Sequence, residues 1–195
     1  MKQLFFLAVF VGVVSAASAQ AFTKQATAAR TAYTAGKLDD SRFALQQMLQ
    51  ELDLVTGKEI LKLLPQKLDD KPAVTAKDNV SGASGWAGVV VHRVYSSAGK
   101  TIDLETITNS PLIGSLNTIL SLPFIANNGD QKVVKIDGYK ALVQKVSGEN
   151  GASDYELQLP LNATLITLKA PGYTQDQLVK IAGALPISEI AKMVQ

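Results

Sequence analysis

The segment QKVVKIDGYKALVQKV at 131–146, followed by YELQLPLN at 155–162 and ATLITLKAP at 163–171, decides the fold of this chain. Its parts are short, rich in Val, Ile, Leu, Tyr and Thr, and separated by turn residues, which is the pattern of successive strands. The apolar positions change phase across Asp137-Gly138. A two-residue hairpin turn is the preferred explanation, although a glycine bulge in one long strand would also shift the phase.

Two further strands are expected ahead of this segment. Val89 to Tyr95 is apolar at almost every position, which is typical of a central strand. The stretch 101–108 alternates instead, with Ile102, Leu104 and Thr106 on one face and Asp103, Glu105 and Ile107 on the other. This alternation predicts a half-buried antiparallel strand whose outer face is in contact with water.

Residues 21–64 carry the pattern of two helices. Gly36 is placed to close the first helix, Gly57 is expected to interrupt the second, and Pro65 ends it. The second helix has an apolar stripe at helical spacing, made of Leu45, Met48, Leu49, Leu52 and Val55. The stripe predicts a face that packs on the sheet or on a second subunit.

Helix signals also follow the first strands and end the chain. Asn109-Ser110-Pro111 combines a capping side chain with a proline suited to the first helical position. Thr174 and Gln177 form a capping box for a C-terminal helix, and 187–194 form a last amphipathic turn or two. This order predicts an α+β fold: an antiparallel sheet of about five or six strands, covered by helices on one face and preceded by an N-terminal helical hairpin.

The N-terminus has the features of a signal peptide. Lys2 gives a basic start, an apolar run follows, and Ala17-Ser18-Ala19 is a cleavage signal. The run is shorter than the roughly 20 residues that span a bilayer, so a retained anchor helix is the weaker alternative. We therefore expect a signal peptide at 1–19, a helical hairpin at 20–65, a linker loop at 66–85 and an α+β domain at 86–195. The processed protein would be periplasmic or secreted, with no membrane span.

Charge and cysteine content argue against several classes of protein. The formal charge of +2 falls to +1 on cleavage, because Lys2 is the only charged residue of 1–19. Without a Lys/Arg cluster, a nucleic-acid partner is not expected. The absence of cysteine excludes a disulfide scaffold and a thiol nucleophile, and with a single histidine it excludes the usual zinc sites. No cofactor, metal or catalytic residue is expected.

Five residues are candidates for a binding surface: Trp86, His92, Asn109, Ser110 and Tyr139. Trp86, Asn109 and Ser110 mark the places where the sheet should meet the loop that ends at Trp86 and the helix start at 109–111, and His92 lies on the strand predicted for 89–95. Each candidate has a structural alternative. The lone tryptophan is more often a lid on the core than a ligand platform, and His92 is more often a hydrogen-bonded ring in or on the sheet than a catalytic group.

Residues 86–194 resemble small exported bacterial domains of the PsbP-like and DcrB-like kind. The resemblance is carried by the strand pair around IDGYKALV, the strand ATLITLKA and the Thr174-capped helix QDQLVKIAGAL. It implies a non-catalytic envelope protein that binds or steadies another component. Separately, AYTAGKLDDSRFALQQMLQELD at 32–53 resembles one helical hairpin of a tetratricopeptide repeat. It occurs once, whereas about three stacked repeats are needed, so a solenoid is not expected.

The leading functional hypothesis is an exported, non-enzymatic binding or accessory protein of the bacterial envelope. It would bind a protein or small ligand through a face of the sheet or through the helical hairpin, and residues 20–65 could form a homo-oligomer. The alternatives are a carboxylate-dependent hydrolase of the envelope, with Asp103 and Glu105 as candidate acid and base, and a purely structural surface protein.

Overall fold

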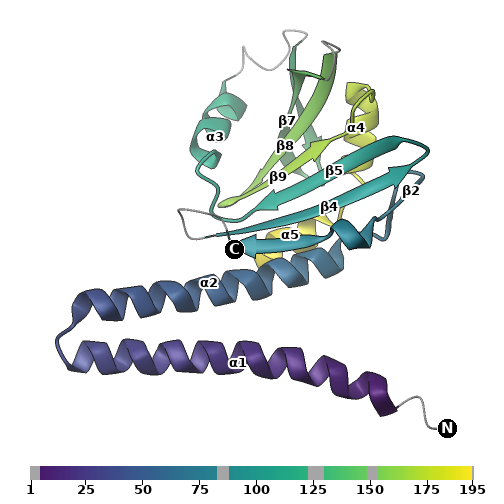
Figure 1. Ribbon diagram of the computed structural model, residues 1–195. Helices are drawn as coiled ribbons and strands as arrows, with labels where there is room; N and C mark the ends of the chain where they lie inside the picture. Colours follow the sequence, from purple (N-terminus) through teal and green to yellow (C-terminus); the bar gives the residue numbers. More distant parts are fainter. Residues whose placement is uncertain (1–4, 83–87, 123–129, 149–152, 195) are drawn as a thin grey trace. The chain divides into compact units, whose positions relative to one another are not determined.

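The computed structural model describes residues 5–82, 88–122, 130–148 and 153–194, with side chains from residue 20 onward. In this part the chain is α+β, as predicted (Figure 1). It has α-helices at both ends, a seven-stranded antiparallel sheet and a small two-stranded sheet. The main sheet therefore has more strands than the five or six expected.

The chain divides into two compact units, Met1–Val55 and Thr56–Gln195. The first unit contains α1 (Phe5–Thr34) and most of α2 (Leu38–Leu63). Gly36 has a φ of 73°, which is the left-handed conformation expected of a helix-ending glycine. The Ser41 hydroxyl donates to the carbonyl of Ala29 at 3.0 Å, and Ala29 and Ala44 are buried. Small side chains thus form the contact between the two helices.

The main sheet belongs to the second unit and runs in the order β3-β4-β5-β9-β8-β7-β6. Its strands are β3 (Asn79–Gly82), β4 (Val89–Ser97), β5 (Lys100–Ile107), β6 (Gln131–Ile136), β7 (Tyr139–Ser147), β8 (Ser153–Leu161) and β9 (Thr164–Lys169). All neighbours are antiparallel. The alternation predicted for 101–108 is confirmed, because Ile102, Leu104 and Thr106 are buried.

The hairpin turn at Asp137-Gly138 is confirmed and the bulge alternative is wrong. Ile136 pairs with Tyr139, and both central residues have positive φ, 50° and 85°. Positive φ at both positions is the two-residue turn whose twist matches that of the flanking strands. The Asp137 carboxylate also accepts hydrogen bonds from the backbone and hydroxyl of Ser188, which ties the turn to the C-terminal helices.

One face of the main sheet, here called the inner face, is buried over its central strands. It carries Ile102, Leu104, Leu157, Leu159, Ile166 and Leu168. The helix α4 (Gln175–Ala182) lies over it, buries Leu178 and Ile181, and begins with the predicted capping box at Thr174. The helix α5 (Ile187–Met193) follows and buries Ile187 and Ile190.

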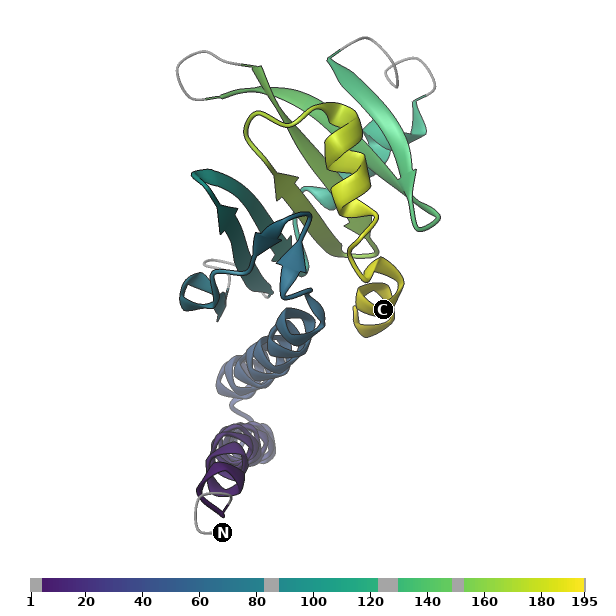
Figure 2. The same ribbon diagram turned by 90° about the vertical axis from the view of Figure 1, so that its right-hand side faces the viewer.

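The opposite, outer face is not free of helices, which corrects the expectation of helices on one face alone. The helix α3 (Ile113–Ser121) packs Leu116 and Leu120 against Leu142 and Leu165 at one end of this face. Figures 1 and 2 show α3 and α4 on opposite sides of the strands β7–β9. The physical reason is that β7 and β9 each carry a leucine on the outer face, Leu142 and Leu165, and these two side chains also need cover.

The segment 66–85, expected to be a linker loop, is structured where it is described. It contains β1 (Lys67–Leu68), β2 (Lys71–Pro72), the short 3-10 helix η1 (Thr75–Lys77) and β3 of the main sheet. Its Asp78 accepts two hydrogen bonds from Arg93, at 2.9 and 2.6 Å, and Arg93 also donates to the carbonyl of Leu64 at 2.9 Å. A buried charge pair therefore fastens this polar segment to the sheet.

Two expected helix boundaries differ. The helix α2 continues through Gly57 without interruption. The glycine serves packing here, because the absence of a side chain allows the helix to approach β3 and β4 closely. The helix α3 begins at Ile113, two residues beyond Pro111, and no side chain caps it. Asn109 instead adopts a φ of 51° in the turn before it, so the Asn-Ser-Pro signal marks a turn followed by a helix.

Candidate functional site

Polar side chains form two rows across the outer face of the main sheet, in the part that α3 does not cover. The pairing register places one row in the order His92, Glu105, Thr167, Gln158 and the next in the order Asp103, Lys169, Glu156, Gln144. These side chains come from β4, β5, β9, β8 and β7. The strand alternation places them there, because every second residue of each strand points to this face.

His92 and Asp103 are in contact on this face. The Nε2 atom of His92 lies 3.0 Å from both carboxylate oxygens of Asp103. The two residues are diagonal neighbours, since His92 is directly opposite Glu105 and Asp103 lies two positions before Glu105. The side chain of His92 is 29% exposed, so the ring lies on the sheet surface and is not enclosed in the core.

A second polar contact lies further along the sheet. Glu156 is almost buried, accepts a hydrogen bond from the Gln158 amide at 2.5 Å, and lies 3.4 Å from the Lys169 ammonium. A pocket of about 310 Å³ adjoins this pair, and Asp154 and Tyr155 also line it. This volume is at the lower limit for small-ligand pockets. Of its charged groups, Glu156 and Lys169 are paired with each other, and Asp154 accepts the backbone N–H of Gly172 at 2.9 Å.

This arrangement has limited catalytic capacity. The His92–Asp103 contact resembles the base-and-orienter half of a nucleophilic site, but His92 Nε2 is already directed at Asp103, and no hydrogen bond of the described residues joins the ring to a hydroxyl. The described residues include no cluster of three or more His, Asp or Glu side chains that could hold a metal ion. The face is suited to polar contacts.

The residues proposed from the sequence do not form one site. Asn109 is exposed, whereas Ser110 is buried and its backbone N–H donates to the carbonyl of Ala163 at 2.9 Å, which is a structural role. Tyr139 is 36% exposed beside the hairpin turn, on the inner-face side of β7. His92 lies on the outer face. Trp86 lies outside the described residues.

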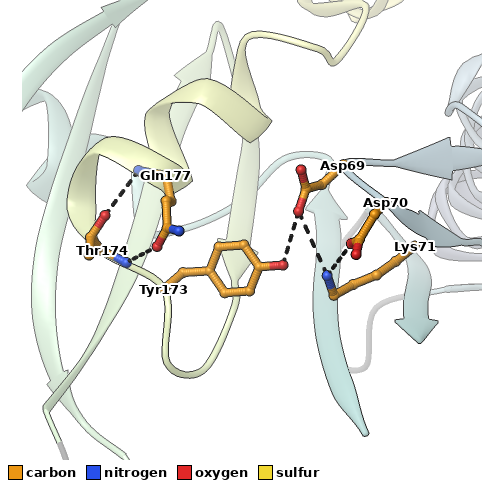
Figure 3. A network of polar contacts seen from close by, with 6 residues as sticks. All are labelled: Asp69, Asp70, Lys71, Tyr173, Thr174 and Gln177. Atoms are coloured by element: carbon orange, nitrogen blue, oxygen red, sulfur yellow. Dashed lines mark hydrogen bonds and ion pairs between the residues drawn. The ribbon is translucent and has the colours of Figure 1, made fainter. Parts of the chain in front are cut away.

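A network of polar contacts around Lys71 was not indicated by the sequence. Lys71 is only 3% exposed, and its ammonium lies 2.5 Å from Asp70, 3.7 Å from Asp69 and 5.2 Å from the centre of the Tyr173 ring (Figure 3). The Tyr173 hydroxyl donates to Asp69 at 3.2 Å. The Asp70 contact raises the pKa of Lys71 above its ordinary value, and the same contact lowers the pKa of Asp70. A lysine held charged in this way is a poor nucleophile. The network has a structural role instead, because its contacts link the β1–β2 hairpin to Tyr173, just before α4.

The first unit has an uncovered apolar face. Four leucines of α2 are between 50% and 61% exposed and share one side of the helix; this set, the leucine ridge, is Leu38, Leu45, Leu49 and Leu52. Three of them belong to the stripe expected from the sequence to be packed. The described part of the chain therefore leaves the stripe without a partner, apart from Met48, which is partly buried.

Among the described helices, none is both long enough and apolar enough to cross a membrane. The chain matches no protein-family model, no curated protein and no solved structure. The resemblance to PsbP-like and DcrB-like domains therefore stays a prediction.

Proposed function

We propose that this protein is an exported, non-enzymatic accessory protein of the bacterial envelope, and that it acts by binding protein through the leucine ridge of α2. The observation that carries the proposal is the exposure of the ridge, at least 50% for each of its four leucines. Scattered exposed leucines are ordinary, whereas several exposed leucines gathered on one side of a helix mark an interaction site.

The energetics support the same proposal. Removing apolar surface from water is worth roughly 25 cal/mol per Å², and a fully buried leucine contributes about 1.5–3 kcal/mol. Four half-exposed leucines on one helix face are therefore a substantial unused source of binding energy. The outer face of the sheet has no comparable reserve, because its exposed groups are polar and several are already paired with one another.

Export is part of the proposal and rests on the N-terminal sequence. Cleavage after Ala19 would leave a chain that begins at Gln20, within α1. Mass determination of the protein recovered from the envelope of an expressing bacterium should give the mass of residues 20–195. A protein that keeps residues 1–19 and fractionates with the cytoplasm would contradict export.

Site-specific photo-crosslinking tests the binding function. A photoreactive residue at Leu45 should give a covalent protein adduct in cells, because this position lies within the ridge. The same residue at Lys180, which is exposed on α4, is the matched control and should give none. The Leu45 adduct should disappear when Leu49→Glu is added. The proposal fails if neither position gives an adduct or if both give the same ones.

A hydrolase is the second candidate, favoured by the 3.0 Å contact between His92 and Asp103 with Glu105 directly across the strand pair. Two carboxylates and a histidine on one exposed face could share acid and base roles. Hydrolysis of glycan or ester substrates that is lost in Asp103→Asn and kept in Asp154→Asn would support this candidate. A substrate panel without any turnover would remove it.

A further inference from the structure

The leucine ridge has the spacing of a coiled-coil seam. Leu45 and Leu49 are four residues apart, Leu49 and Leu52 three apart, and Leu38 lies seven residues before Leu45. Alternating three- and four-residue steps keep side chains on one line when two helices pack along their length. The seam therefore fits another α-helix lying along α2.

Two charged residues accompany this seam and have no partner within it. Arg42 stands at the seam position between Leu38 and Leu45, and Asp53 borders Leu52. Within the part of the chain that the structure describes, neither side chain forms an ion pair or a hydrogen bond. Burial raises the pKa of Asp53, so its carboxylate has lost part of its hydration without gaining a cation.

We propose that the leucine ridge packs against the leucine ridge of a second copy of this chain, antiparallel to it and related by a two-fold axis that passes through the seam between Leu45 and Leu49, at the level of Gln47. This inference rests on the proposed function, because it names the protein that the ridge binds. Leu45 lies two positions before Gln47 and Leu49 two positions after it, so the symmetry brings Leu45 of each copy against Leu49 of the other. Arg42 lies five positions before Gln47 and Leu52 five positions after it, so Arg42 of each copy lies against Leu52 of the other.

Charge decides between the two directions of packing. A parallel pair in register would place Arg42 beside Arg42 in the seam, which is repulsive, and would leave Asp53 without a cation. In the antiparallel pair, the aliphatic part of Arg42 covers Leu52 of the second copy and its guanidinium reaches Asp53 of that copy. The two-fold axis repeats both contacts with the two copies exchanged. Such self-complementarity is what a two-fold symmetric interface requires, and it is not needed for binding an unrelated protein.

Light scattering and sedimentation on the protein as the cell processes it test the inference. The wild type should be a dimer, and Leu49→Glu should raise the dimer dissociation constant at least roughly 100-fold, because it places a carboxylate in the apolar seam. Leu112→Glu is the matched control, since Leu112 is equally exposed, at 52%, but lies outside the ridge. It should remain dimeric. A dimer that survives Leu49→Glu, or that Leu112→Glu dissolves equally, would overturn the inference.

A charge exchange tests the direction of packing. Arg42→Glu alone and Asp53→Arg alone should each weaken the dimer, and the double variant should restore it, because each new glutamate again faces an arginine. A parallel dimer would gain nothing from the double variant, so failure to restore the dimer rules out the antiparallel pair.

The crosslinking result separates this inference from the proposed function. A monomeric wild type with a Leu45 adduct to a different polypeptide would sink the second copy as the occupant and leave the binding function standing. A monomeric wild type without any adduct would remove both.

Discussion

Gly57 lies so close to Val89 that a Cβ atom on the glycine would be 2.6 Å from Cγ1 of that valine. Val80 and Val91 would lie at 2.9 and 3.2 Å from the same atom. Real Cβ atoms almost never approach another heavy atom to 2.6 Å. The last turns of α2 therefore rest directly on β3 and β4, and the absence of a side chain at position 57 makes this packing distance attainable.

Gly57→Ala should lower the free energy of unfolding by about 1–3 kcal/mol, because the valines must move to admit the methyl group. Alanine normally stabilises a helix interior relative to glycine by roughly 0.8–1 kcal/mol, so the sign of the change is informative. Gly114→Ala in α3 is the matched control, since its Cβ would meet no atom within 4 Å, and it should stabilise. Urea unfolding measures both. Stabilisation by Gly57→Ala would contradict the packing described.

Thr106 and Thr108 should respond in opposite ways to replacement by valine. The Thr106 hydroxyl is buried and has no hydrogen-bond partner among the described residues, whereas that of Thr108 accepts the backbone N–H of Val89 at 2.8 Å. Thr106→Val should raise the free energy of unfolding by about 1 kcal/mol, and Thr108→Val should lower it by about 1–2 kcal/mol. Thermal and urea unfolding measure both changes. If both variants shift the free energy of unfolding in the same direction, the prediction is wrong.

Arg93→Met should lower the free energy of unfolding by about 3–5 kcal/mol, because it leaves Asp78 as a nearly buried carboxylate without its cation. The carbonyl of Leu64 also loses its donor. The double variant Arg93→Met, Asp78→Leu should recover much of the loss, since both charges are then absent. Additive losses in this double-mutant cycle would mean that the two side chains act independently.

The buried Tyr95 should make the protein sensitive to alkali. Burial raises the pKa of Tyr95 to about 12, with the guanidinium of Arg93 opposing the rise. The ordinary value of about 10 applies in the unfolded chain, so the stabilisation from Tyr95 is complete below about pH 10 and is lost as the pH rises towards 12. Tyr95→Phe should remove this part of the alkaline loss. Urea unfolding near pH 9 and near pH 11 gives the comparison, and equal losses in both proteins would contradict the assignment.

Features set by neighbours in the chain were predictable. The Asp137-Gly138 hairpin, the Thr174–Gln177 capping box and the alternation of 101–108 each depend on residues within a few positions of one another, and the structure has all three. Features set by distant contacts were not predictable. Gly57 was expected to interrupt a helix, because a glycine in a helical pattern usually weakens it. Its role in the structure is to allow close packing on β4, and the residues of β4 are far along the chain.

The same distinction applies to the candidate surfaces. Asp103 and Glu105 were placed correctly on a wet outer face by alternation alone. The contact of Asp103 with His92 depends on the register between β4 and β5, which no local pattern reveals. The segment 66–85 was expected to be a loop because it is polar, and Asp78 in it shows why that was misleading: its carboxylate is paired with a buried arginine.

The order of strands in the main sheet has a consequence for how the protein folds. Among the described strands, every pair of neighbours is consecutive in the chain except β5 and β9. The hairpin series β3–β5 and β6–β9 can each form through local contacts, whereas joining Ile107 to Leu165 closes a long loop that contains α3. Loop closure of this kind costs entropy before contacts compensate for it, so the pairing of β5 with β9 should be the slow step of folding. Until these two strands pair, each has an unpaired edge that can bind a strand of another chain, and the protein is most prone to aggregate during this interval.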